Sequence, residues 1–160
     1  MMEITRLQVA EPPVAKGIHK LQLESYQREA SLIEYPHLPP LRESFEEVAN
    51  FHGVVYGVQR KDALLGVIFV EPAKESTAAT IAKLFVAENE GRKGIGRSLV
   101  TFVKTRYNTL YVSTAERNEP AIRLYQKLGF CEKFRIVIDP WLTLCTFEWK
   151  KRSDTDVFTV

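Results

Sequence analysis

Residues 91–97 read Gly-Arg-Lys-Gly-Ile-Gly-Arg, and this run decides how the rest of the chain is interpreted. Three glycines in six positions let backbone N–H groups point into one concavity. From Ile95 onward, apolar residues recur with a helical period at Leu99 and Phe102. The run therefore leads into a helix, whose positive N-terminal end favours an anion, and its basic side chains add charge. We predict a phosphate-binding loop that needs no metal ion.

The segments before this loop predict strands. Ala78–Val86 is an apolar run, so the glycine-rich loop joins a strand to a helix. Gly53–Gln59 and Ala63–Glu71 are two further β-rich runs, and the polar residues 60–62 between them indicate a hairpin. Together the three runs predict an antiparallel meander.

The N-terminal third predicts one strand, two helices and a loop. Ile4–Val9 is the strand. The first helix is predicted by apolar residues that share one face, which are Val14, Ile18, Leu21 and Tyr26. Ala30–Pro40 contains three prolines and predicts a loop. Leu41, Phe45 and Val48 then mark a second helix with a polar outer face.

The segment 118–130 reads Asn-Glu-Pro-Ala-Ile-Arg-Leu-Tyr-Gln-Lys-Leu-Gly-Phe and predicts a helix with both ends marked. Asn118 suits the N-cap, and Pro120 is tolerated in the first turn, where no backbone donor is needed. Gly129 stands where a left-handed C-terminal residue is wanted. Phe130 is placed for the apolar contact that often accompanies such an end.

The remaining segments predict a single domain. Leu110–Ser113 predicts a short strand before this helix, and Cys131–Ile138 and Leu142–Lys150 predict a closing hairpin. No repeat or change of composition marks a second domain, so residues 1–150 are predicted to form one domain and residues 151–160 a polar tail.

Composition and charge exclude several classes of protein. The 22 basic and 20 acidic residues leave a net charge of +2, too small for wholesale attraction to nucleic acid or an anionic membrane. No apolar run approaches a membrane span, and the start of the chain lacks a signal-peptide pattern, so we predict a cytoplasmic protein. Cys131 and Cys145 lack metal-ligand spacing and are predicted to be reduced thiols, and no metal site is predicted.

Two other phosphate-binding patterns match parts of the loop. Gly91–Gly96 followed by Arg97 nearly matches the P-loop of nucleoside triphosphatases, but an arginine replaces the lysine of that loop. The next strand also ends without an aspartate to help hold magnesium. Gly91–Gly94 matches the Gly-X-X-Gly clamp of KH modules, but that clamp joins two helices. A solvated glycine-rich turn is the plain alternative.

The loop and the segment 118–130 together resemble the site of the GNAT family, the GCN5-related N-acetyltransferases. The resemblance is densest in Leu84–Val103 and Leu110–Phe130, and the order of elements matches over nearly the whole chain. It implies an α/β fold with a central mixed, mostly antiparallel sheet flanked by helices. It also implies acetyl-CoA as the acyl donor.

The resemblance assigns roles to individual residues. The strand edge that would bind the pantetheine arm through its backbone comprises Leu84, Phe85 and Val86. The loop that would hold the pyrophosphate comprises Gly91, Arg92, Lys93, Gly94, Ile95, Gly96 and Arg97. Asn118 would contact the cofactor where the strands near Val86 and Val112 splay apart. Tyr125, about two turns or roughly 10 Å further along the helix, would place its hydroxyl near the sulfur.

The loop departs from the family pattern at one position. The family usually has glutamine or arginine three positions before Gly94, whereas this chain has Gly91 there and Arg92 one place later. We therefore assign most of the hold on the pyrophosphate to backbone N–H groups. A bulky β-branched residue at Gly94 is predicted to weaken cofactor binding more than Arg92→Ala does.

The resemblance implies an N-acetyltransferase in which an amine attacks the thioester directly in a ternary complex. Tyr125 would donate to the departing sulfur. Because a thiol has a pKa of about 8.5 and tyrosine one of about 10, loss of Tyr125 should slow turnover rather than abolish it. The strand 78–86 lacks the glutamate that serves some members as the base. We assign the base to Glu88, which follows this strand. The other candidates for the base are Glu71, Glu34, His37 and a water relay.

Tyr35 and His37 are the predicted acceptor-binding residues, because the resemblance places the proline-rich loop beside the acceptor. No dense acidic wall is present, so we expect a small-molecule or peptide amine as partner, without nucleic acid or membrane, and a homodimer is left open. The alternative to an enzyme is a catalytically weak coenzyme A-binding regulatory or interaction module. Retention of Asn118 and Tyr125 favours the enzyme.

Overall fold

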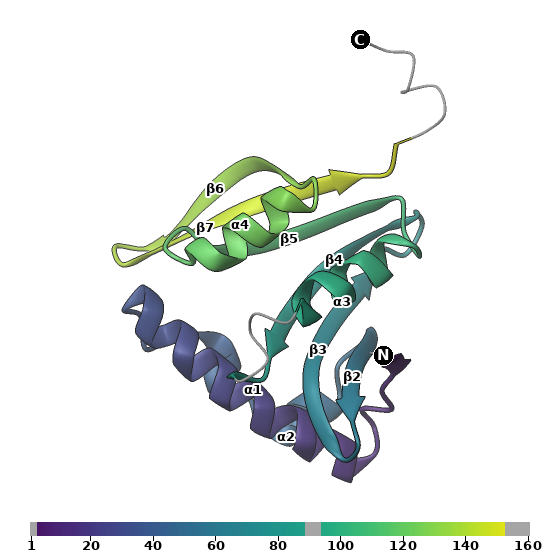
Figure 1. The fold of residues 1–160 in the computed structure, drawn as a ribbon. Helices are drawn as coiled ribbons and strands as arrows, with labels where there is room; N and C mark the ends of the chain where they lie inside the picture. The colour runs from purple at the N-terminus through teal and green to yellow at the C-terminus, as the bar shows by residue number, and fades with distance from the viewer. Residues whose placement is uncertain (1–2, 89–93, 153–160) are drawn as a thin grey trace.

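The computed structural model describes residues 3–88 and 94–152. Its centre is a seven-stranded sheet in the order β1-β2-β3-β4-β5-β7-β6, whose neighbouring strands are antiparallel apart from the parallel pair β4 and β5 (Figure 1). The strands are β1 (Ile4–Arg6), β2 (Val54–Arg60), β3 (Ala63–Pro72), β4 (Ala78–Val86), β5 (Thr109–Ala115), β6 (Cys131–Asp139) and β7 (Leu142–Lys150). The predicted fold class, with a mixed and mostly antiparallel sheet, is confirmed.

Helices cover both faces of the sheet (Figure 1). They are α1 (Pro12–Ile33), the short 3-10 helix η1 (Pro39–Leu41), α2 (Phe45–Ala49), α3 (Ile95–Lys104) and α4 (Glu119–Lys127). Helices α1 and α2 pack on one face in a core that includes Phe69 and Phe85. Helices α3 and α4 pack on the other face, where Leu99 and Tyr125 meet Ile68. The result is three layers with a separate apolar core on each side of the sheet.

The first helix is longer than the sequence predicted. It ends at Ile33, so the loop predicted from Ala30 is wrong over its first turn. Ala30 and Ile33 are buried in a small core with Leu142 of β7, and this tertiary packing extends the helix beyond its regular apolar period. Glu34, with a φ of 56°, ends the helix, and the Tyr35 N–H donates to the Ala30 carbonyl.

The second helix begins later than its apolar pattern indicated. Leu41 lies in η1, whereas α2 begins at Phe45. Ser44 and Glu47 form a capping box: the Glu47 N–H donates to the Ser44 hydroxyl at 3.2 Å, and the Ser44 N–H donates to the Glu47 carboxylate at 3.4 Å. This reciprocal pair satisfies two donors at the helix end and fixes where α2 starts.

A β-bulge interrupts β4 near its middle. The register with β3 pairs Val70 with Ile81 but the preceding Phe69 with Lys83, so Ala82 is the extra residue. A bulge bends its strand and strengthens the local twist, and bulges occur often beside functional sites. Here the bulge directly follows the last residue of β4 that pairs with β5.

The bulge also changes which side chains of β4 face which helices. Before it, Ile81 belongs to the core under α3 and α4; after it, Leu84 and Val86 pack there. Lys83 and Phe85 face the α1 side, where Phe85 joins the second core. The apolar spacing of three between Ile81 and Leu84, in place of two, was the sign of this bulge in the sequence.

Beyond the bulge, β4 and β5 diverge. Their parallel pairing ends at Ile81 and Val112, although the strands continue to Val86 and Ala115 (Figure 1). Strand β5 keeps its antiparallel partner β7 along its other edge as far as Ala115. The predicted splay is therefore confirmed, and it leaves one edge of the second half of β4 without a strand partner among the described residues.

Helix α4 has the two ends that its sequence predicts. Asn118 is the N-cap and accepts a hydrogen bond from the Ala121 N–H at 3.3 Å. At the other end Gly129 has a φ of 89°, and the Phe130 N–H donates to the Tyr125 carbonyl at 2.9 Å. The rings of Phe130 and Tyr125 meet edge to face with centroids 5.4 Å apart. This Schellman end and its apolar contact fix the position of the Tyr125 ring.

Gly129→Ala is expected to lower the free energy of unfolding by about 1 to 2 kcal/mol, because an L-residue is strained at this positive φ. The added methyl group would lie 3.6 Å from the Trp149 ring, an ordinary contact, so the loss is conformational. The matched control is Gly17→Ala on α1, where nothing lies within 4 Å of the new atom and a gain of about 0.5 to 1 kcal/mol is expected. Urea unfolding measures both, and equal stability of the two variants would contradict this interpretation.

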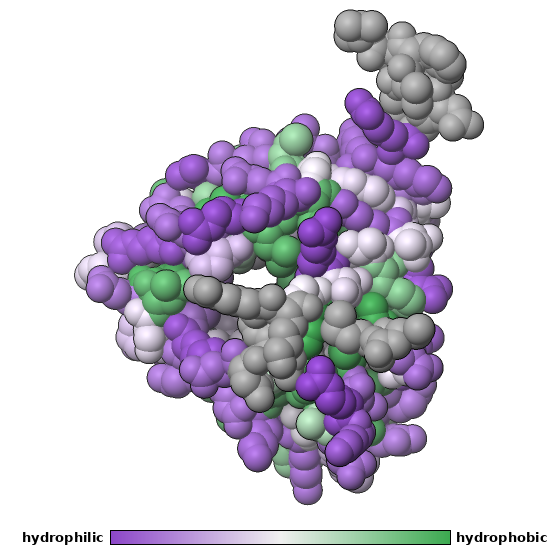
Figure 2. All heavy atoms as spheres, in the orientation of Figure 1, coloured by the Kyte–Doolittle hydropathy of each residue, from purple (hydrophilic) through white to green (hydrophobic). Residues whose placement is uncertain are grey.

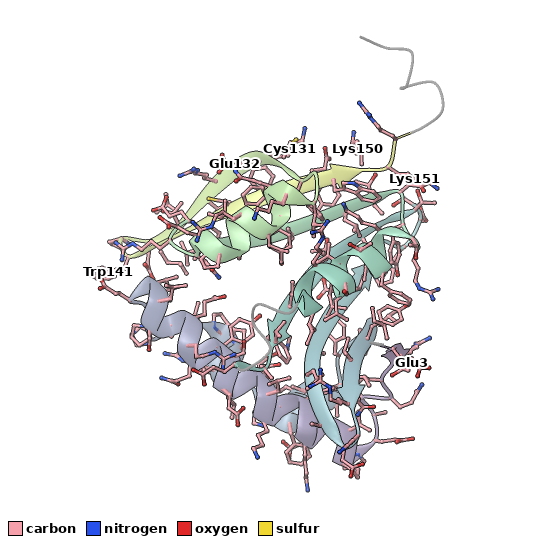
Figure 3. All side chains as sticks on the ribbon, in the orientation of Figure 1. Glu3, Cys131, Glu132, Trp141, Lys150 and Lys151 are labelled. Carbon is pink, nitrogen blue, oxygen red and sulfur yellow. The ribbon has the colours of Figure 1, made fainter. Side chains whose placement is uncertain are left out.

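The last strand in the sheet, β6, is an exposed edge. Its large apolar side chains reach solvent, and these are Phe134, Ile136, Val137 and Ile138. Trp141 is exposed at the tip of the β6–β7 hairpin, and Cys131 lies towards the far end of β6 (Figure 3).

Cys131 is exposed and Cys145 buried, and both are free thiols. Cys145 pairs across the ladder with Arg135, so the two cysteines are not cross-strand neighbours.

Candidate functional site

A cleft of about 1230 Å³ lies where β4 and β5 diverge. Its walls come from α1, the second half of β4, the last residues of β5, the start of α3 and one face of α4. Figure 2 shows the molecule hollowed at this place, with the background visible through it. The cleft is therefore open on two faces, so that two molecules could enter it from different sides.

One end of the cleft contains the start of α3. Gly94, with a φ of 76°, is the N-cap of α3, and the first intrahelical bond runs from the Ser98 N–H to the Gly94 carbonyl. The N–H groups of Ile95, Gly96 and Arg97 therefore lack intrahelical acceptors and mark the positive end of the helix. Gly94, Gly96 and Arg97 line the cleft. The predictions for Gly91, Arg92 and Lys93 fall outside the described residues.

Helix α4 adds two cations that sequence reasoning missed. Arg123 and Lys127 line the cleft from the same face of α4, one turn apart. Arg97, near the start of α3, lines the same cleft. The sign in the sequence was the spacing of four between two basic residues on a helix already assigned to the site. The site's charge therefore comes from two helices and not from the loop alone.

The three residues predicted to bind the pantetheine arm, Leu84, Phe85 and Val86, all line the cleft, and their role in binding stays a prediction. The Ala87 N–H donates to β3, at the Leu65 carbonyl, so by the alternation of an antiparallel ladder the N–H and C=O of Val86 point the other way, into the gap. The Val86 carbonyl accepts a hydrogen bond from Arg28 Nη2 at 2.7 Å. The Val86 N–H is thus directed at the cleft.

Tyr125 lines the cleft from α4 and is only 4% exposed. Its ring also lies against Phe147 of β7. Burial, and then the negative charge of Glu29, raise the pKa of Tyr125 above its ordinary value of 10.0. No hydrogen bond to its hydroxyl is formed by any other residue of 3–88 and 94–152. Tyr125 therefore presents a protonated hydroxyl that is available to a ligand.

Glu29 of α1 is a site residue that sequence reasoning did not find. It is half-buried and lines the cleft, and its Oε1 accepts a hydrogen bond of 2.8 Å from Asn118 Nδ2. This bond joins α1 to the start of α4 across the cleft. Burial raises the pKa of Glu29 above 4.5, and the Asn118 hydrogen bond partly offsets the rise. The predicted contact of Asn118 with the cofactor stays a prediction, while its amide already bridges two helices.

A buried ion pair lies beside this wall. Lys83 Nζ donates to Gln22 Oε1 at 2.9 Å and to Glu43 Oε1 at 2.8 Å, and it lies 4.2 Å from the centre of the Phe69 ring. Gln22 Nε2 in turn donates to the Pro40 carbonyl at 2.9 Å. These bonds engage the Lys83 ammonium and tie α1 and the segment before α2 to β4. Lys83 is therefore a structural element of the cleft wall.

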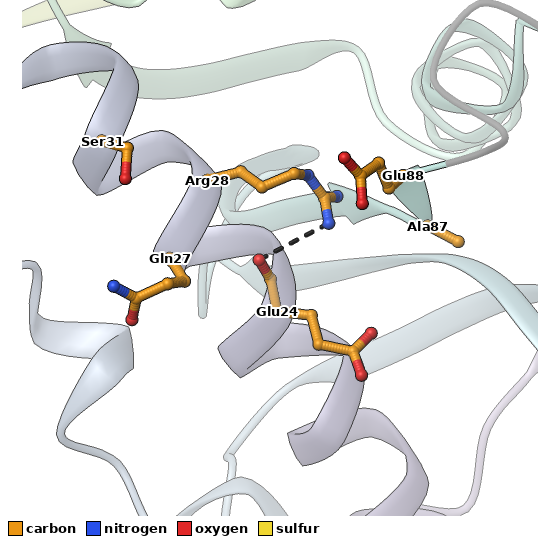
Figure 4. A pocket seen from close by; sticks show the side chains of 6 residues that line it. All are labelled: Glu24, Gln27, Arg28, Ser31, Ala87 and Glu88. Carbon is orange, nitrogen blue, oxygen red and sulfur yellow. Dashed lines mark hydrogen bonds between the residues drawn. The ribbon is translucent and has the colours of Figure 1, made fainter.

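Glu88, the predicted base, is exposed at the end of the cleft. It also borders a neighbouring open groove of about 770 Å³, shown in Figure 4 with Glu24, Gln27 and Arg28 of α1. The Arg28 side chain extends from α1 towards Glu88, and its Nη1 donates to the Glu24 carbonyl at 3.5 Å. The role of Glu88 stays a prediction.

The two residues predicted to bind the acceptor lie outside the cleft lining. Tyr35 is buried, and its hydroxyl donates to Asp139 Oδ2 at 2.7 Å. His37 is exposed and meets the Tyr35 ring edge to face at 5.8 Å. Leu38 and Pro40 from the same segment do line the cleft. The segment therefore reaches the site, and the roles of Tyr35 and His37 stay predictions.

No helix among the described residues is long and apolar enough to cross a bilayer. No group of three or more His, Cys, Asp or Glu side chains within residues 3–88 and 94–152 is placed to hold a metal ion.

Comparison with known proteins gives one family. The model of the Acetyltransferase (GNAT) family matches residues 15–130. The UPF0157 protein YqkA of Bacillus subtilis (strain 168) is 35% identical over 154 residues, which is 94% of this chain and 44% of that protein. The chain thus spans less than half the length of this curated relative.

Solved structures show the same fold. The ribosomal-protein-S18-alanine N-acetyltransferase from Escherichia coli superposes with a TM-score of 0.73 at 17% identity, over 99% of both chains. YncA, a putative acetyltransferase from Salmonella typhimurium solved with its cofactor acetyl-CoA, gives a TM-score of 0.67 at 13% identity, over 96% of this chain and 95% of that one.

Proposed function

The chain belongs to the GNAT acetyltransferase family, and from this premise we propose that it transfers the acetyl group of acetyl-CoA to a primary amine bound in the same complex. The observation that carries the proposal is the cleft between β4 and β5, which is open on two faces and has the Tyr125 hydroxyl on its wall. Direct transfer needs both substrates in one cavity, and this cavity has room for two.

The described residues fit acetyl-CoA. A strand edge without a strand partner, ending in the inward-directed Val86 N–H, suits the amide groups of a pantetheine arm. The start of α3, with Arg97, Arg123 and Lys127 around it, suits phosphates. When bound, acetyl-CoA supplies an activated acetyl thioester whose sulfur is the leaving group.

The chain's own groups would then act on the reacting atoms. A backbone N–H at the open edge of β4 near Val86 would polarise the carbonyl and stabilise negative charge on its oxygen. The Tyr125 hydroxyl would donate a hydrogen bond to the sulfur as charge develops there. Because burial keeps Tyr125 protonated, it can donate throughout the neutral range. Tyr125 is buried, and a hydrogen bond is stronger where water is excluded.

Gly94→Val is expected to weaken acetyl-CoA binding about tenfold. A β-branched residue at a φ of 76° carries a conformational strain of about 1 to 2 kcal/mol. Relief of this strain would move the N–H groups of the first turn of α3 away from the phosphates. Isothermal titration calorimetry with acetyl-CoA measures the change, and Arg92→Ala serves as the comparison. If Arg92→Ala weakens binding more than Gly94→Val does, side-chain charge and not the backbone holds the phosphates.

Acetyl-CoA turnover against a panel of amines tests the proposed function. The panel would contain small-molecule amines, peptide α-amines and peptidyl-lysine, with thiol release as the readout and mass spectrometry of the acetylated product. Thiol release that depends on an amine would support the enzyme. Binding of acetyl-CoA without thiol release on any acceptor would identify a coenzyme A-binding module instead.

A further inference from the structure

Helix α1 turns a polar stripe towards the interior of the molecule. Gln22, Tyr26 and Glu29 follow one another at spacings of four and three, which places them on one face of the helix. Such a face normally carries apolar residues when it packs on a sheet. Here Gln22 is fully buried, and Tyr26 and Glu29 are half-buried and line the cleft. Gln22 belongs to the buried cluster around Lys83, so Tyr26 and Glu29 are the two members of this row that face the cleft.

We propose that Glu29 is the catalytic base, which accepts a proton from the nitrogen of the acceptor amine; this inference rests on the proposed function. Glu29 lines the same cavity as Tyr125, and the two residues lie on opposite walls, on α1 and α4. Its Oε1 is held by Asn118, whereas Oε2 has no partner among residues 3–88 and 94–152. One oxygen is thus fixed and the other is free to take a proton.

The proton balance of the reaction is as follows. An acceptor that arrives as an ammonium ion loses one proton to Glu29 Oε2, and the lone pair so freed forms the new C–N bond. The C–S bond breaks, and its electron pair leaves with the sulfur. The nitrogen loses a second proton as the amide forms, and the sulfur takes one up, with the Tyr125 hydroxyl as its hydrogen-bond donor. Glu29 returns its proton to solvent, so each turnover of an ammonium ion releases one proton.

The surroundings of Glu29 support this role. Burial raises the pKa of Glu29 above 4.5, which makes its carboxylate a stronger base. The other ionisable groups that line the cavity are Tyr26 and Arg28 from α1, Lys83 and Glu88 from β4 and its end, Arg97 from α3, and Arg123, Tyr125 and Lys127 from α4. Lys83 is engaged by Glu43 and Gln22, and the guanidinium of Arg28 by backbone carbonyls. Glu29 is therefore a half-buried carboxylate in the cleft with no cationic partner among the described residues, whereas Glu88 in the same cleft is exposed.

Asn118 acts as a positioning residue for this base. Its Oδ1 caps α4 and its Nδ2 holds Glu29, so one side chain fixes both the helix that carries Tyr125 and the carboxylate opposite it. Asn118 and Tyr125 belong to the same helix, α4. The hydrogen bond from Asn118 to Glu29 therefore fixes the carboxylate relative to the helix that carries the Tyr125 hydroxyl.

Glu29→Gln is the principal test, because glutamine keeps an acceptor for Asn118 but cannot take the proton. We expect kcat/KM to fall about 100-fold, within the range of general base catalysis, and the acidic limb of the wild-type pH profile to disappear. Calorimetric binding of acetyl-CoA should be unchanged. Glu24→Gln is the matched control, since Glu24 lies on the same helix but is exposed outside the cleft, and it should keep the wild-type pH profile.

A second readout does not depend on activity. Because folding raises the pKa of Glu29, its ionisation costs stability, and this cost is absent at low pH and appears as the pH rises above about 4.5. The unfolding temperature of Glu29→Gln minus that of the wild type should therefore increase from pH 4 to pH 7. Glu24→Gln, measured in the same way, gives the comparison for a carboxylate on the same helix outside the cleft.

Asn118→Ser tests the positioning role, since serine keeps the N-cap but loses the Nδ2 donor. Loss of that donor removes the interaction that lowers the pKa of Glu29, so the acidic limb should move to higher pH. An unchanged limb would remove Asn118 from this role.

The outcomes separate the two proposals. If the wild type acetylates an amine, and Glu29→Gln has the same kcat/KM and the same acidic limb in its pH profile as the wild type, Glu29 is not the base. If Glu88→Gln alone abolishes the limb, the base is Glu88. If the wild type releases no thiol with any amine, the proposed function itself fails, and the base assignment fails with it.

Discussion

Lys83→Met is expected to lower the free energy of unfolding by about 3 kcal/mol, the lower end of the range for breaking a buried ion pair. The Lys83 side chain is 8% exposed and that of Glu43 29%, and their charged atoms are 2.8 Å apart. Methionine keeps the apolar stem, but it leaves the Glu43 carboxylate without its cation and Gln22 Oε1 without its donor. Both groups lose a partner that water replaces only in part.

Two further variants isolate the cause of this loss. Lys133→Met removes an exposed lysine that lies 3.3 Å from Glu148, and it is expected to change stability by about 1 kcal/mol or less. The double variant Lys83→Met/Glu43→Gln should be more stable than Lys83→Met alone, because it leaves no uncompensated charge. Denaturant unfolding measures all three. A loss at Lys83 no greater than that at Lys133 would show that the buried pair contributes no more than an exposed one.

Tyr125→Phe is expected to lower kcat by about 100-fold or more, if the hydroxyl donates to the sulfur as proposed. Phenylalanine keeps the edge-to-face contact with Phe130 and removes only the oxygen. That oxygen has no hydrogen-bond partner in the described part of the chain, so the folded state should be at least as stable as the wild type. Loss of rate with unchanged or higher stability is the signature of a catalytic hydroxyl.

The control for this variant is Tyr107→Phe. Tyr107 packs at the edge of the same apolar core but does not line the cleft. Steady-state kinetics of both variants, together with their unfolding temperatures, separate catalysis from packing. Because the pKa of Tyr125 is raised above 10.0, ionisation of Tyr125 should not produce a basic limb below about pH 10 in the wild type. A Tyr125→Phe variant with the wild-type kcat would remove this residue from the reaction.

Local signals in the sequence predicted most of the fold. β4 has the predicted bounds, and α4 has both predicted ends, because Asn118 and Gly129 act through their immediate neighbours. The end of α1 was missed because it depends on packing against Leu142, more than a hundred residues away in the chain. The bulge at Ala82 was missed because a single extra residue scarcely disturbs an apolar run.

The site was predicted where its residues follow one another in the sequence, and missed where tertiary contacts build it. Tyr125 lies about two turns after Asn118 on one helix, and both residues line the cleft. Glu29 precedes Asn118 by 89 positions, and only the folded chain brings the carboxylate to the amide. The apolar face that predicted α1 includes Tyr26, and nothing in the local sequence distinguishes Glu29 from the other polar residues of the helix.

The bulge at Ala82 also separates the pairing of β4 from the course of the strand. Deleting Ala82 would leave Ile81 opposite Val70, Lys83 opposite Phe69 and Leu84 opposite Ile68, so the ladder with β3 would become regular and each of these side chains would keep its face. Such a deletion would instead remove the local bend and extra twist at the point where β4 and β5 part. We therefore expect the extra residue to matter more for the width of the cleft than for the packing of the two cores.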